Sequence, residues 1–188
     1  MGNFYTNCAI RGVATEEVVG FFEETGRSGV VVPERDGWVV VCPEETEAQH
    51  PVVIEAFAKE ISGRLGCVVF AVLNHDDDVL AYWLARDGVL LDRYVSDPGA
   101  LEGGEEAPEG GDAGVLCEAV GRPGARDEVE KILHPPGDED PFEYSAMLRH
   151  EALVEALGLP ACTVGLGYMT ASMGDLPEDL EEDELIEV

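Results

Sequence analysis

The sequence predicts an α+β fold, in which a ferredoxin-like βαββαβ core is extended by a β-meander into a mostly antiparallel sheet. Runs of β-branched and apolar residues at 30–32 and 38–41 predict strands. Asp-Gly pairs at 36–37 and 87–88 lie between such runs, a pattern typical of tight hairpins. Apolar residues at helical spacing over 51–65 predict an amphipathic helix. Together these signals favour a sheet with helices packed on it.

The predicted elements of the first half follow one another in the order βαββαβ, with two further strands. The first strand covers 4–11, and the first helix runs from Thr15 to Gly26, a residue suited to a helix end. Pro51 opens the second helix and Gly66 ends it. The strands of the meander are predicted at 68–73, 79–85 and 89–95.

The chain divides into four parts by composition. We expect residues 1–96 to form the sheet body. Residues 97–112 hold five glycines and six acids, and they predict an acidic, flexible loop. Residues 113–170 are expected to pack a helical extension and a final strand on the same body, and 171–188 to form an acidic tail.

Two elements of the second half have clear boundaries in the sequence. Ser145 suits the N-cap of a helix over 145–157, which Gly158 would end. Residues 161–168 read as a last strand that rejoins the main sheet, and their two glycines indicate a bulge or a close backbone approach.

The charge of the chain limits its partners. It has 40 Asp and Glu against 11 Lys and Arg, a formal net charge of −29 at pH 7. Nucleic acid is not an expected partner, because phosphate contacts need clustered Lys and Arg. A membrane is not expected either, since anionic lipids would repel the chain and no stretch has the roughly 20 apolar residues of a span. A basic protein is the partner that this charge fits.

The five cysteines indicate the cellular compartment of the protein rather than a catalytic or metal-binding role. They have no C-x-x-C spacing, and most lie within or directly before apolar runs, where free Cys behaves as a small hydrophobe. We therefore expect reduced thiols in a cytoplasmic protein, with no cofactor and no zinc site. The cysteines are Cys8, Cys42, Cys67, Cys117 and Cys162.

The densest polar cluster is the run of residues 74–78, Asn-His-Asp-Asp-Asp. One interpretation is a divalent-cation or acid/base site built on His75, Asp76 and Asp78. The other is a turn, because Asn and Asp favour turns and neighbouring side chains of an extended chain point in different directions. The spacing of a calcium loop is absent, so the turn is the prediction and the site is the alternative.

Two further groups of residues are candidates for contact with a partner. Tyr82 and Trp83 are neighbours on a predicted strand, so one is expected in the core and the other on the surface as an anchor. Leu180, Leu185 and Ile186 interrupt the acidic tail. The tail is then a disordered end, a segment that docks on a basic partner, or a cover for an apolar groove of its own domain.

These observations lead to three hypotheses about function. The first is a binding protein, of the inhibitor or immunity type, whose acidic surface attracts a basic protein. The second is that the acidity serves only solubility or adaptation to salt. The third is an enzyme or a metal-binding protein that uses the 74–78 run.

Overall fold

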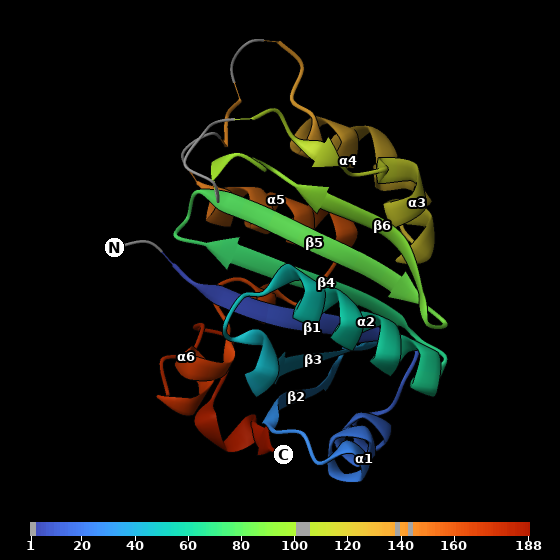
Figure 1. Ribbon diagram of the computed structural model, residues 1–188, viewed down its shortest axis with the longest axis vertical. Helices are drawn as coiled ribbons and strands as arrows, with labels where there is room; N and C mark the ends of the chain where they lie inside the picture. The colour runs from blue at the N-terminus through green and yellow to red at the C-terminus, as the bar shows by residue number, and fades with distance from the viewer. Residues whose placement is uncertain (1–2, 101–105, 138–139, 143–144) are drawn as a thin grey trace.

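The computed structural model describes residues 3–100, 106–137, 140–142 and 145–188, and it shows an α+β fold built on one 8-stranded antiparallel sheet (Figure 1). The strands are β1 (Tyr5–Arg11), β2 (Gly29–Arg35), β3 (Trp38–Pro43), β4 (Val68–His75), β5 (Val79–Arg86), β6 (Val89–Val95), β7 (Glu109–Gly110) and β8 (Ile186–Glu187). Their order across the sheet is β7-β6-β5-β4-β1-β3-β2-β8, and each neighbouring pair is antiparallel.

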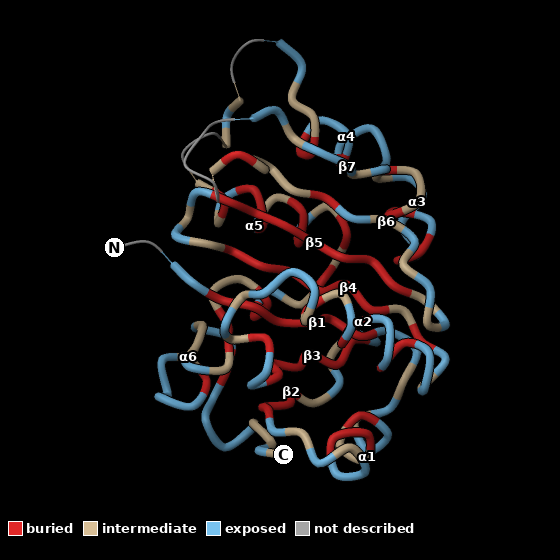
Figure 2. Tube along the Cα trace, in the orientation of Figure 1, coloured by how far each residue is buried: buried red, intermediate tan, exposed pale blue. Residues whose placement is uncertain are grey.

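Helices cover both faces of this sheet. The helices α1 (Thr15–Thr25) and α2 (Pro51–Leu65) enclose one hydrophobic core with the sheet. The second core lies on the opposite face, beneath α3 (Ala113–Ala119), α4 (Arg126–Leu133), α5 (Ala146–Leu157) and α6 (Tyr168–Ser172). Because both faces are covered, the central strands are buried along most of their length (Figure 2). Among the described helices, none is both long enough and apolar enough to cross a membrane.

The Asp-Gly pairs form hairpin turns, as predicted. Asp36 and Gly37 have φ angles of 53° and 84°, and they connect β2 to β3. Asp87 and Gly88 have φ angles of 50° and 80° between β5 and β6. Two successive left-handed residues match the right-handed twist of the flanking strands, and Asp and Gly tolerate that conformation. These turns fix the register of the sheet locally.

Both outermost strands come from segments whose composition predicts an acidic loop and an acidic tail. β7 pairs with β6, although the loop was predicted over 97–112; residues 101–105 of that prediction lie outside the described residues. β8 pairs with β2, and the backbones of Gly29 and Val188 exchange two hydrogen bonds of 3.0 Å. The tail is thus an ordered edge of the sheet in the structure.

The predicted last strand over 161–168 is wrong. This segment forms a short 3₁₀ helix, η4 (Ala161–Thr163), and leads through a bend into α6. The reason is a buried side chain on β1: the amide of Asn7 donates to the carbonyls of Thr163 and Leu166, at 2.7 Å each. Those bonds satisfy backbone groups that a strand would have paired with a neighbouring strand.

Arginines from the sheet hold the second half of the chain on the body. Arg86, at the end of β5, donates to the carbonyl of Ala119 at 2.9 Å, and Arg11 donates to the carbonyl of Val120. These carbonyls lie at the C-terminal end of α3, where the helix dipole favours cations. Both cations therefore serve in packing rather than in binding an anionic ligand.

Candidate functional site

The 74–78 run forms the turn between β4 and β5, and its polar groups support the fold. Asp76 and Asp77 adopt left-handed φ angles of 53° and 65°. The carboxylate of Asp77 accepts the N–H of Met147 at 2.9 Å, and its carbonyl accepts the N–H of Ala146 at 2.7 Å, so the turn caps α5. Nδ1 of His75 lies 2.7 Å from the side-chain oxygen of Gln49.

These contacts use His75 and Asp77 to hold the turn in place. Within the described ranges of the chain, no three His, Cys, Asp or Glu side chains are grouped in a way that holds a metal ion, and His75, Asp76 and Asp78 are no exception. Strand geometry explains this result, because successive side chains of an extended chain point in different directions. His75 contacts Gln49, whereas Asp77 contacts the start of α5.

The cysteine thiols are poorly suited to nucleophilic chemistry. All five are free and buried, and burial raises the pKa of each one. The pKa of Cys67 rises to about 11 and that of Cys162 to about 12. A thiolate is the reactive form of cysteine, so none of these thiols is activated near neutral pH.

Tyr82 and Trp83 do not provide the surface anchor that was expected of one of them. Tyr82 is completely buried and donates through its hydroxyl to Asp92 at 2.6 Å, while Trp83 is 4% exposed. The expectation was wrong because it assumed one open sheet face, whereas α2 and α5 cover opposite faces of β5.

The hydrophobic residues of the tail pack against the protein's own body. Leu180 is 5% exposed and belongs to the core beneath α6, while Leu185 and Ile186 are half-buried at the borders of the two cores. Arg35 fixes the tail by donating to a carboxylate oxygen of Glu184 at 2.8 Å and to the carbonyl of Asp179 at 2.7 Å. Since its apolar side chains face inward, the tail presents mainly carboxylates outward.

An exposed apolar ridge lies next to this tail, at α6 and its C-terminal cap. Met169 on α6 is 44% exposed, and Met173, the C-cap residue, is 72% exposed. The N–H of Met173 donates to the carbonyl of Met169 at 3.0 Å, so the two residues lie one helical turn apart on the same side. The opposite side of α6 packs on the sheet through the buried Ala171. We call Met169 and Met173 the methionine ridge.

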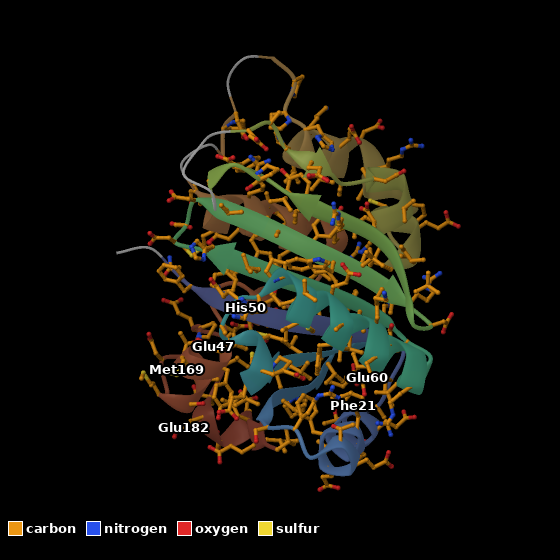
Figure 3. The ribbon with its side chains drawn as sticks, viewed as in Figure 1. Phe21, Glu47, His50, Glu60, Met169 and Glu182 are labelled. Atoms are coloured by element: carbon orange, nitrogen blue, oxygen red, sulfur yellow. The ribbon has the colours of Figure 1, made fainter. Side chains whose placement is uncertain are left out.

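Carboxylates lie at both ends of the methionine ridge. At the start of α6, the carboxylate of Glu47 lies near the backbone N–H groups of Met169 and Tyr168; burial raises the pKa of Glu47, and the nearby N–H groups lower it by less. At the other end, the carboxylate of Glu182 lies beside Gly174. One of its oxygens is 3.9 Å from the point where a Cβ atom on that glycine would be. Figure 3 shows Glu47, Met169 and Glu182 along the same edge of the molecule.

Eight of the eleven cations of the chain have partners within the protein. Six of them form ion pairs with carboxylates among the described residues, and Arg11 and Arg86 bind helix carbonyls as described above. The paired cations are Arg27, Arg35, Lys59, Arg64, Arg93 and Arg149. The exposed carboxylates around α6 and the tail therefore outnumber the cations that could neutralise them.

The position of α6 depends on Asn7. An Asn7→Ala variant is expected to lose about 2–3 kcal/mol of unfolding free energy, because two buried carbonyls lose their donor. Urea denaturation measures this loss, and hydrogen exchange over 161–172 is expected to speed up. Asn3→Ala, at an exposed position, is the control; equal losses in the two variants would contradict the role given to Asn7.

Comparison of the chain with protein-family models, with curated proteins and with solved structures gives no match. The candidate site therefore depends on the geometry alone. The sequence contains one signal for it that the strand prediction over 161–168 does not cover: Met169 and Met173 have helical spacing immediately before an acidic segment.

Proposed function

We propose that this protein binds a basic, amphipathic segment of another protein through the methionine ridge and the carboxylates beside it. The observation that carries the proposal is the exposure of two methionines, Met169 on α6 and Met173 at its C-cap, between Glu47 and the acidic tail. Methionine is over-represented at surfaces that bind several partners, because its flexible thioether adapts to the apolar side chains of each.

The charge around the ridge selects the class of partner. A segment with apolar residues on one side and Lys or Arg on the flanks would place its apolar side on Met169 and Met173 and its cations against the carboxylates. Complementary charge speeds association and excludes acidic competitors. The occupied state of the protein's own cations supports this assignment, because they offer little competition for the same carboxylates.

A synthetic helical peptide of Lys and Leu tests the proposal. The double variant Met169→Ser and Met173→Ser is expected to bind it about tenfold more weakly, because two apolar contacts are lost from the interface. Calorimetric titration measures the affinity. Val52→Ser is the matched control, since Val52 is 81% exposed on α2. Equal weakening by the control and the ridge variant would refute the proposed site.

Salt distinguishes the proposal from the alternative that the acidity serves only solubility. Binding through the ridge is expected to weaken at least about tenfold between low salt and 0.5 M NaCl, because exposed charges are screened. The solubility alternative predicts no saturable binding of the peptide at any salt concentration. A saturable but salt-independent affinity would contradict the part assigned to the carboxylates.

We further infer that the first half of the chain is a ferredoxin-like core in a reducing compartment. The strand order β4-β1-β3-β2, with α1 and α2 on one face, supports that core, and β5 and β6 extend it as a meander. The free state of the five cysteines supports a cytoplasmic location.

A further inference from the structure

A groove lies between the end of α5 and η4, apart from the methionine ridge. Its volume is about 460 Å³, which is within the range of small-molecule sites. The floor is apolar and the rim on the α5 side is acidic. The floor consists of Val154, Leu159, Ala161 and Val164, and the rim consists of Glu151 and Glu155.

The groove follows from the way in which α5 ends. Gly158 adopts a left-handed φ of 65°, and the N–H of Leu159 donates back to the carbonyl of Val154 at 3.0 Å. Pro160 then directs the chain into η4, where the hydroxyl of Thr163 donates to the Pro160 carbonyl at 2.8 Å. The chain therefore reverses beside the helix that it has just left, and a hollow separates the two.

The floor of the groove is part of the folded core. Val154 and Leu159 are 8% and 7% exposed, and both belong to the core beneath α5. These side chains are already ordered in the absence of a ligand. Binding therefore does not include the entropic cost of ordering them.

The rim gives the groove a preference for positive charge. Glu151 and Glu155 are exposed, lie four residues apart on one side of α5, and take part in none of the ion pairs found among the described residues. The last turn of α5 contains no basic residue, although the negative end of its dipole lies there. The guanidinium of Arg122 lies directly beside Gly158, so the chain already places one cation at this helix end.

We propose that this groove binds an aliphatic amine. The alkyl chain lies on Val154, Leu159 and Val164, and the protonated amine is held by the carboxylates of Glu151 and Glu155. An alkyl carboxylate would have one cation, Arg122, in its favour and two rim carboxylates against it. The site is independent of the proposed function, because it uses none of the residues of the methionine ridge.

Three probes with the same eight-carbon chain test the proposal by calorimetric titration at pH 7: n-octylamine, 1-octanol and octanoate. We expect octylamine to bind most tightly and octanoate most weakly. The double variant Glu151→Gln and Glu155→Gln is expected to weaken octylamine about tenfold, as the loss of two exposed ion pairs implies. Glu118→Gln with Glu128→Gln, exposed acids on α3 and α4, removes the same net charge and is expected to leave the affinity unchanged.

A groove-filling variant tests the location separately from the charge. Ala161→Phe is expected to abolish octylamine binding, whereas Met169→Ser with Met173→Ser is expected to preserve it. Circular dichroism and thermal melting verify that each variant is folded. The proposal is overturned by the absence of saturable octylamine binding, by equal affinity for the three probes, or by undiminished binding to a folded Ala161→Phe protein.

Discussion

An Arg149→Ala variant is expected to unfold with about 3–5 kcal/mol less free energy than the wild type, as is typical when one partner of a buried charge network is removed. Arg149 lies on α5 and is 2% exposed. Its guanidinium donates to Asp140, to the hydroxyl of Tyr94 at 3.0 Å and to the carbonyl of Ile132 at 2.5 Å. Removal leaves these acceptors without their donor and creates a cavity between α4 and α5.

Urea denaturation of three variants separates burial from charge. Arg64→Ala is the control, because Arg64 pairs with Glu24 at 2.9 Å on the surface and such pairs contribute about 1 kcal/mol or less. Arg149→Lys keeps the charge but lacks the planar fork that reaches several acceptors, so an intermediate loss is expected. A loss for Arg149→Ala no larger than that of Arg64→Ala would contradict the structural role of this side chain.

Acidification is expected to destabilise the protein through His150, by up to about 1.4 kcal/mol for each pH unit below about 6.5. His150 is completely buried, and that burial lowers its pKa from 6.5 to about 3. Its Nδ1 shares a hydrogen bond of 2.8 Å with the hydroxyl of Tyr5, while its Nε2 has no hydrogen-bond partner. The folded protein therefore holds this ring neutral.

The sign of the effect follows from proton binding. Above pH 6.5 the ring is neutral in both the folded and the unfolded state, so the histidine adds no pH dependence. Between pH 6.5 and about 3, His150 binds a proton in the unfolded chain but not in the folded chain. The free energy of unfolding therefore falls as the pH falls.

A substitution isolates this contribution from the carboxylates. With a net charge of −29, the protein gains stability in acid as repulsion is relieved, which opposes the histidine effect. The difference in unfolding free energy between wild type and His150→Gln, measured from pH 7.5 to 4.5, removes this background. His50→Gln, at an exposed histidine, is the control and is expected to retain the wild-type slope. Parallel pH profiles for wild type and His150→Gln would refute the assignment.

The parts of the fold that the sequence predicts correctly are those decided by neighbouring residues. Asp36-Gly37 and Asp87-Gly88 form hairpins because their own backbone preferences select the turn. The helix at 146–157 begins where the Ser145 hydroxyl accepts the N–H of Leu148 at 3.2 Å, and it ends at Gly158. Both signals lie within a few residues of the element that they determine.

The incorrect predictions concern segments whose structure is determined by contacts with residues distant in the sequence. Residues 161–168 have the composition of a strand, but two of their carbonyls bind Asn7, which lies 156 and 159 positions earlier in the chain. For the tail, the sequence allows a disordered end, a docking segment or a cover for its own domain, and the contacts with Arg35 and the edge of β2 decide between them. The methionine ridge was not predicted, because α6 follows the supposed strand in a segment for which no helix was expected. Local propensity carries no information on such partners.

The short outermost strands have a consequence for the protein in a crowded solution. An open sheet edge invites the strands of other chains, and this is how many β-proteins polymerise. Here each edge ends in a strand of two residues, and each of these strands carries an exposed glutamate, Glu109 or Glu187. A strand from another chain could form few backbone hydrogen bonds with an edge strand of two residues. It would also meet the negative charge of the glutamate on that edge strand. Part of the surplus acidity thus protects the sheet from fibre growth.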